Sequence, residues 1–204
     1  MNTDMSDLLK IIIEVCITVG SLLGALAINH AYVQHQNKKI AARSLSRVRS
    51  ELQNNAKIVK SYYESEQRTY EHLIATMKKI EKVPAKKWKQ FSQSDENIKM
   101  NIRHEILQES VYKVMVQTGV LHHIELNVLV RLSDIYATQA IFNRSFDTLL
   151  NIALETKRVS YDKELFVRSI GSFSDRMEIM LALSTGLESM YTKAIEELNA
   201  SLHE

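Results

Sequence analysis

Residues 11 to 28 read IIIEVCITVGSLLGALAI, and Glu14 is the only charged residue among them. A helix needs about 20 predominantly apolar residues to cross the hydrocarbon core of a bilayer. Continuing the stretch to Val33 supplies that length and places Tyr32 where an interfacial aromatic residue is expected. The sequence therefore predicts that residues 1–33 form an N-terminal tail and one transmembrane helix.

A cleaved signal peptide is the alternative interpretation of this stretch. Asp4 and Asp7 precede it against a single Lys10, whereas a signal peptide begins with a net positive charge. Cys16, the only cysteine of the chain, lies inside the stretch, which excludes a disulfide framework and a thiolate metal site. A retained anchor is favoured, and a reducing compartment fits this cysteine usage.

Basic residues follow the apolar stretch directly. Residues 34 to 49 contain no acid, and their five basic residues are Lys38, Lys39, Arg43, Arg47 and Arg49. Lysine and arginine accumulate on the cytoplasmic side of membrane helices, where they also contact anionic lipid headgroups. We therefore expect a single-pass protein of the cell inner membrane, with its N-terminus outside and residues 34–204 in the cytoplasm.

Two features of the apolar stretch indicate contacts with another membrane helix. Gly20 and Gly24 form a G-x-x-x-G motif, which lets two helix backbones approach closely. Glu14 is a carboxylate within the span, and such a group usually faces a partner or water. It either pairs locally with Lys10, one turn away, or forms a ring in an oligomer that lines a pore. We expect a homo-oligomer, with Glu14, Gly20 and Gly24 at the membrane-helix interface.

The remaining 34–204 segment has the composition and periodicity of an all-α domain. The whole chain holds only five glycines and one proline, Pro84, too few for a turn-rich β fold. Apolar residues recur at three- and four-residue steps over long stretches. Four helices in an antiparallel bundle are predicted, a first one ending near Pro84 and others at about 96–118, 122–158 and 161–201.

Polar residues interrupt the predicted apolar stripes at three positions. Asn55 and Glu66 fall on or near the stripe of the first helix, and Gln139 falls on that of the third. An uninterrupted coiled-coil seam is therefore not expected, although the stripes are heptad-like.

Three stretches carry a resemblance to known sequences. They are Glu51-Leu-x-Asn-Asn55, VYKVMVQTGVLHHI (111–124) and LVRLSDIYATQAIFNRSFD (129–147). In this order they resemble a loose group of uncharacterised prokaryotic proteins with one or two N-terminal membrane helices. That group has a Glu-x-x-x-Asn helix, an aromatic–small–Gly segment and a Leu-Ser-x-x-Tyr helix with a later Asn. The resemblance covers about half of the chain, departs at Tyr112, where the group often has tryptophan, and implies the architecture without an activity.

Enzymatic chemistry and a cofactor are not expected. No nucleophile elbow, phosphate-binding loop or dinucleotide-binding glycine pattern occurs in the sequence. The histidines include no H-x-x-x-H pair, and the adjacent His122 and His123, with Glu125 nearby, point in different directions on a helix. A polar helix start is therefore favoured there over a metal site.

A lysine cluster around Pro84 is the candidate ligand site. Residues 78–89 hold six lysines with Glu81 as the only acid, and Lys82, Lys86, Lys87 and Lys89 surround Trp88. Lysines beside an aromatic ring can bind an anion and stack a base. At 1.5 Å per residue, a straight helix would place the cluster roughly 70 Å from the membrane, too far for lipid contact. The alternative is a solvated turn without a ligand.

These features predict a membrane-anchored, self-associating helical sensor or effector. Small bacterial membrane effectors of antiphage defence are built this way, including CRISPR-associated proteins that bind a cyclic oligoadenylate, so a nucleotide second messenger is one expected ligand. The architecture alone supports that link. The alternative is a scaffold subunit of a membrane complex, with a protein partner and no ligand.

Overall fold

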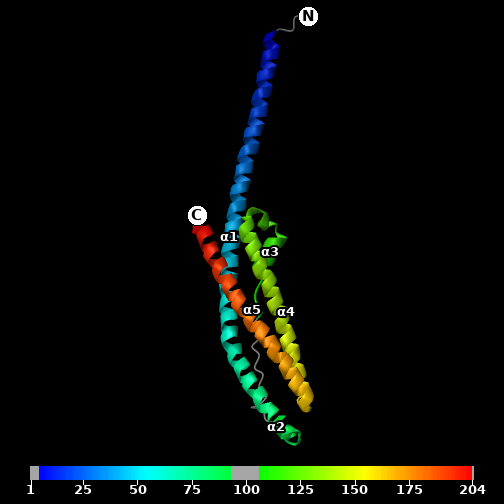
Figure 1. The fold of residues 1–204 in the computed structure, drawn as a ribbon. Helices are drawn as coiled ribbons and strands as arrows, with labels where there is room; N and C mark the ends of the chain where they lie inside the picture. The colour runs from blue at the N-terminus through cyan, green and yellow to red at the C-terminus, as the bar shows by residue number, and fades with distance from the viewer. Residues whose placement is uncertain (1–4, 93–105, 204) are drawn as a thin grey trace.

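One uninterrupted helix forms both the anchor and one wall of the bundle. The computed structural model describes residues 5–92 and 106–203, and α1 runs over 77 of them, Met5–Glu81 (Figure 1). The apolar part of α1 projects beyond the other helices, and the window long and apolar enough to cross a membrane is not buried by the protein. The prediction of one long apolar N-terminal helix is confirmed, and this helix continues without a break into the bundle.

The length of α1 follows from the lack of helix breakers. No glycine or proline lies between Gly24 and Pro84, so every backbone N–H in that stretch can bond within the helix. Pro84 adopts an extended conformation, and the chain turns there into the short helices η1 (Ala85–Lys87) and α2 (Trp88–Ser92). The predicted end of the first helix near Pro84 is therefore confirmed.

Two further long helices complete the bundle, α4 (Leu126–Arg158) and α5 (Lys163–His203). Both carry the predicted apolar stripes inward, including Leu132, Phe142 and Phe146 on α4. α5 packs along both α1 and α4, and it buries Phe173, Met177, Met180, Ser184, Leu187, Tyr191, Ala194 and Leu198. The all-α class is confirmed, and no strand occurs in residues 5–92 or 106–203.

The predicted second helix at about 96–118 is confirmed over Ser110–Gln117 and wrong at residues 106–109. Residues 106–109 are not helical, and α3 covers only Ser110–Gln117. Residues 93–105 lie outside the described residues. The helix is displaced because side chains of α1 and α4 hydrogen-bond the backbone of 107 and 108, which then cannot form helical bonds.

Because a turn follows α3, α4 begins further along the chain than predicted. Gly119 has a left-handed conformation with φ 70°, which favours glycine, and it ends α3. The 3₁₀ helix η3 (Val120–His123) follows, so α4 begins at Leu126 rather than near residue 122. Within residues 5–92 and 106–203 the structure therefore has three long helices, α1, α4 and α5, and the shorter α3.

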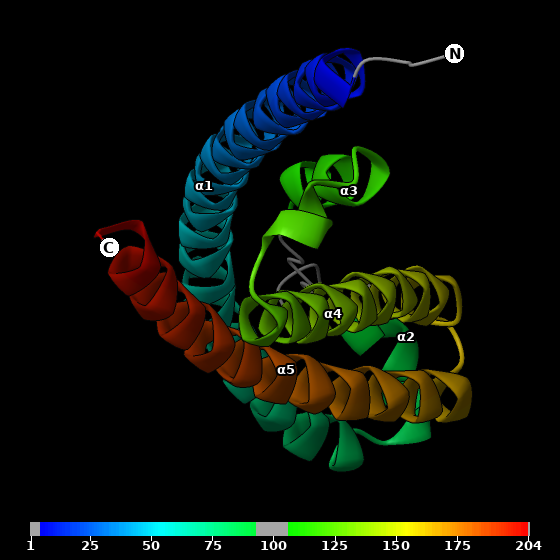
Figure 2. The same ribbon diagram turned by 90° about the horizontal axis from the view of Figure 1, so that it is seen from above.

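The bundle has two distinct ends. Viewed from above, α3 lies on the opposite side of α4 from α5, beside α1 (Figure 2). α3, η3 and the start of α4 lie where α1 leaves the bundle toward its apolar part, which we call the proximal end (Figure 1). α2 and the connection between α4 and α5 lie at the opposite, distal end.

Candidate functional site

Polar side chains from α1 and α4 converge on one segment, residues 107–111, which leads from a non-helical stretch into the first turn of α3. We call this set the polar clamp, and its members are Glu51, Asn55, Tyr136, Gln139 and Asn143. The first two are one turn apart on α1, and the other three are three and four residues apart on α4. Those spacings place each group on one face of its helix, toward the same segment.

The amide side chains of the clamp form hydrogen bonds with the backbone of the segment. Asn55 accepts a hydrogen bond from the Gln108 N–H at 2.9 Å and donates one to the Gln108 carbonyl at 2.7 Å. Gln139 donates to the same carbonyl at 3.0 Å. Asn143 accepts from the Leu107 N–H at 3.4 Å and lies 3.5 Å from its carbonyl oxygen. The segment is thereby held as a strand would be held, with helix side chains in place of a neighbouring strand.

A buried carboxylate holds the next two residues. Glu51 is 5% exposed, and its Oε2 accepts hydrogen bonds from Ser110 Oγ at 3.0 Å and from the Val111 N–H at 2.9 Å. Its Oε1 accepts one from Tyr136 Oη at 2.7 Å. Ser110 is the first residue of α3, so the carboxylate lies at a helix N-terminus, where a negative charge is stabilised. Glu51 therefore ties α1, α3 and α4 together.

The tyrosines around Glu51 remain protonated. Burial raises the pKa of Tyr136 far above its usual range, and the hydrogen bond and charge of Glu51 add to the shift. Burial, followed by the charge of Glu51, also raises the pKa of Tyr191. Tyr112 stacks on Tyr136 with ring centroids 4.2 Å apart. Tyr136 is thus a hydrogen-bond donor at every pH near neutrality.

Two open cavities flank the polar clamp. One of about 370 Å³ lies on the side of α1 and is lined by Ser46, Arg47, Ser50 and Glu51 among others. The second, of about 440 Å³, lies between α3 and α4 and includes Tyr112 and Tyr136. Each cavity is lined in part by one residue of the clamp, Glu51 or Tyr136, and by residues of α3.

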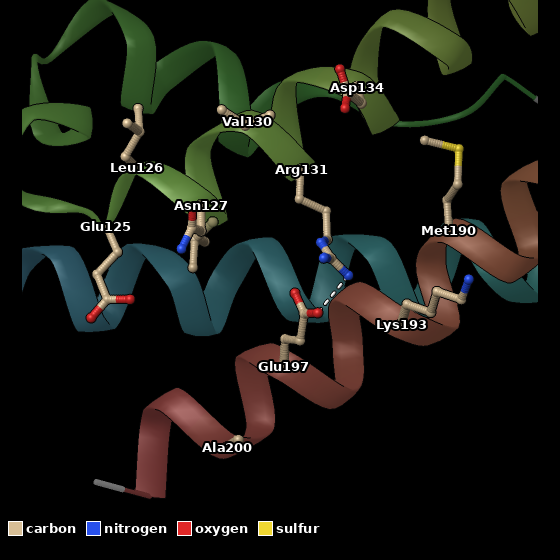
Figure 3. Close-up of a pocket in the computed structure, with 11 residues that line it drawn as sticks. Glu125, Leu126, Asn127, Val130, Arg131, Asp134, Met190, Lys193, Glu197 and Ala200 are labelled. Carbon is tan, nitrogen blue, oxygen red and sulfur yellow. Dashed lines mark ion pairs between the residues drawn. The ribbon is translucent and has the colours of Figure 1, made fainter.

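A larger open groove of about 850 Å³ lies at the proximal end, between the start of α4 and the end of α5 (Figure 3). Its walls mix apolar side chains such as Leu126 and Val130 with charges of both signs. Arg131 and Glu197 form an ion pair across it, which joins the two helices (Figure 3). An exposed ion pair of this kind contributes about 0–1 kcal/mol to stability, so it joins α4 and α5 only weakly across the groove.

The lysine cluster lies at the distal end of the bundle. Its lysines are exposed, whereas Trp88 is buried. Lys82, Lys86, Lys87 and Lys89 are exposed, as the anion-site prediction requires. Trp88 is 4% exposed, donates its indole N–H to the Ser160 carbonyl at 3.1 Å and packs on Phe166. Its predicted role in stacking a base is wrong in this conformation, because its ring anchors the distal turn to the core.

The basic residues after the apolar stretch separate into two groups. Lys38, Lys39, Arg43 and Arg47 are exposed on α1 and available to headgroups. Arg49 is half-buried and donates to Asn199 Oδ1 of α5 at 2.9 Å. Contact of Arg49 with lipid is therefore wrong in this structure, since its guanidinium joins two helices of the bundle.

Inside the apolar part of α1, Glu14, Gly20 and Gly24 all lie on uncovered helix surface. A Cβ built on either glycine meets no atom within 4 Å, so nothing within the chain requires glycine there. The structure thus leaves the predicted interface free for a second helix.

Sequence reasoning saw the members of the clamp without their role. The sequence shows Asn55 and Gln139 only as interruptions of apolar stripes, and Glu51 and Tyr136 only within the stretches that carry the resemblance. The usable signal was that polar residues fall on buried faces, because buried amides and carboxylates require partners.

We predict that Tyr136→Phe destabilises the protein by about 1–3 kcal/mol, because it leaves the buried Glu51 Oε1 without its donor. Thermal unfolding in detergent measures this change. Tyr161→Phe is the control, since Tyr161 is 75% exposed and should change stability by less than about 0.5 kcal/mol. Equal stability of the two variants would show that the hydrogen bond to Glu51 contributes nothing.

No family model matches the chain, and neither a curated protein nor a solved structure matches it. The function is therefore argued from the geometry of this chain.

Proposed function

We propose that this protein is a membrane-anchored, self-associating helical sensor or effector whose bundle and membrane helix change state together. The observation that carries the proposal is the continuity of α1, which is at once the apolar anchor and a wall of the bundle. A helix without an internal break transmits displacement and rotation along its axis, because its backbone hydrogen bonds resist bending.

The polar clamp supports such coupling. Glu51 and Asn55 belong to α1 and lie about 27 and 33 Å along the helix axis from Val33, at 1.5 Å per residue. They are bonded to the 107–111 segment and, through Tyr136 and Gln139, to α4. Release of the segment would leave a carboxylate and an amide of α1 unpaired in the core, so the position of α1 depends on that segment.

Self-association through the apolar part of α1 is supported by the free glycine face. Cys16, Gly20 and Gly24 are four residues apart and therefore share one face of the helix. If two copies pack on this face, their Cys16 thiols come close to each other. The only cysteine of the protein is thus a built-in reporter of the interface.

We predict that Cys16 forms an oxidative cross-link between copies in membranes, and that Gly24→Ile reduces it strongly. A β-branched side chain blocks close backbone approach, and it meets no atom of its own chain. The cross-linked fraction is measured on a non-reducing gel. Ala25→Ile is the matched control, because Ala25 lies about 100° away around the helix and should leave cross-linking unchanged. Equal loss in both variants, or none in either, would reject a glycine interface.

We predict that a reporter fused after Glu204 is active in the cytoplasm of a bacterial host. The exposed basic residues after the span, such as Lys38 and Arg43, favour that side of the inner membrane. Enzymatic reporters that function on only one side of the membrane distinguish the two orientations. Activity on the outer side would overturn the orientation.

An anionic ligand at the distal lysine cluster is the proposed input. Residues 78–89 contain six lysines and one acid, and the ammonium groups repel each other unless an anion is bound. In an oligomer the cluster repeats, so several phosphate contacts add on one ligand with many phosphates. A nucleotide second messenger of antiphage defence is a ligand of this class. Trp88 contributes by supporting the turn, since its ring is buried.

We predict that changing Lys86, Lys87 and Lys89 together to alanine abolishes binding of cyclic oligoadenylate to the full chain in detergent. All three side chains are exposed, so helical content should remain as it was. Calorimetry with titrated ligand measures binding, which should also weaken with added salt. Lys57, Lys60 and Lys193, exposed elsewhere in the chain, give a control triple variant that should retain binding.

If the triple variant binds as the wild type does, the site lies elsewhere. If cyclic and linear nucleotides both fail to bind the wild type, the cluster is a solvated surface, and a scaffold subunit with a protein partner becomes the better function.

A further inference from the structure

The hydrogen bond between Tyr136 and Glu51 allows the proximal end to be placed along α1. It joins α1 to α4, which run in the same direction (Figure 1). Leu126 is ten residues before Tyr136 on α4, and Ala41 is ten residues before Glu51 on α1. Both steps are about 15 Å toward the apolar part, so Leu126 lies roughly level with Ala41.

That level is close to the expected membrane surface. Val33, the end of the apolar stretch, is eight residues from Ala41, which corresponds to about 12 Å along the helix. The headgroup region adds roughly 5–8 Å to each side of the hydrocarbon core. Membrane helices tilt by about 20° on average, and a tilt toward α4 lowers that side by several Å more. The proximal end is therefore within reach of lipid headgroups.

The chemistry of the proximal end suits an interface with lipid. Residues 110–124 contain eight apolar residues and no acid, and Glu125, which follows them, is an exposed acid. Val114, Val116 and Leu126 are each more than half exposed, and Leu126 reaches 73%. We call residues 114–126 of α3, η3 and the start of α4 the proximal cap. Apolar side chains at this depth enter the boundary between headgroups and acyl chains.

The exposed bases of α1 add charge complementarity. Lys38, Lys39 and Arg43 lie on α1 between Val33 and the level of the cap, and each is exposed. Anionic headgroups attract such residues by about 1 kcal/mol each near the surface. Apolar and basic groups thus meet at one depth, where the bundle begins to cover α1 at Ala41.

We infer that the proximal cap is a second membrane contact, which docks the bundle on an anionic lipid bilayer. This inference rests on the proposed membrane anchoring by α1. It assigns to α3 and η3 the role of fixing the tilt and rotation of α1 relative to the bilayer, since a second contact restrains a helix that would otherwise pivot. The 107–111 segment leads directly into α3, so the polar clamp and the cap are joined by the chain itself.

Two leucines of α4 provide a matched test. Leu126 is 73% exposed in the cap, and Leu154 is 63% exposed near the distal end, 28 residues or about 42 Å away on the same helix. In a Cys16→Ser background, Leu126→Cys and Leu154→Cys are each labelled with an environment-sensitive fluorophore. The full chain is reconstituted in phosphatidylcholine vesicles, with or without phosphatidylglycerol, that carry a spin-labelled lipid quencher.

We predict several-fold stronger quenching at residue 126 than at residue 154 in vesicles that contain phosphatidylglycerol. Quenching at 126 should fall when the anionic lipid is omitted and when Lys38, Lys39 and Arg43 are changed together to alanine. Adding Val114→Asp and Val116→Asp should also reduce it, and both positions are exposed enough to accept the change. Thermal unfolding in detergent confirms that these variants remain folded.

Equal quenching at the two positions would overturn the inference, and so would quenching at 126 that does not depend on the anionic lipid. Flotation of the vesicles separates this result from a failure of the anchor. Protein that floats with vesicles but is not quenched at 126 retains its anchor and lacks the second contact, whereas protein that does not float has no anchor.

Discussion

The whole arrangement depends on the continuity of α1, because one part of this helix projects from the bundle and another part is packed inside it. Its first part presents apolar side chains outward, as a bilayer requires, and its later part turns one apolar stripe toward α5 and α4. In both parts the backbone hydrogen bonds close within the helix, which is why no connecting loop is needed. The lack of glycine and proline between Gly24 and Pro84 makes this possible.

Within the bundle, α1 is held by two different kinds of contact. One kind is apolar packing in the core, which includes Leu52 and Val59 and the edge-to-face contact of Tyr62 with Phe142 and Phe146 of α4. The other kind is polar: Glu51 and Asn55 of α1 bind the 107–111 segment. Apolar packing is roughly proportional to area and tolerates sliding, whereas a hydrogen bond to a named backbone atom does not. The polar clamp therefore sets the register of α1 against α4.

This division gives a physical basis for the proposed coupling between the bundle and the apolar part of α1. The clamp has a defined alternative state, in which the 107–111 segment is released. In that state the clamp side chains must form hydrogen bonds with water or with other groups. The residues of the clamp on α1 are rigidly connected to the apolar part, and the 107–111 segment that the clamp holds continues through α3 into the proximal cap. The lysine cluster at the distal end lies on α1 and the turn that follows, so the same helix passes all three regions.

The sequence by itself determined the elements whose signals are local. Hydropathy over 11–33 and the absence of breakers predicted the long first helix, and the apolar stripes identified nearly all of the core positions of α4 and α5. Only the tertiary structure decided where the polar residues on those stripes point. Residues 106–109 are not helical because Asn55 and Gln139, far away in sequence, bind the backbone of Gln108, and local periodicity carries no information about such partners. The same reason explains Trp88 and Arg49. Their side chains are amphipathic, with one polar group on a large body, so their type alone permits a surface or an interior position, and contacts with Ser160 and Asn199 across the fold place them inside.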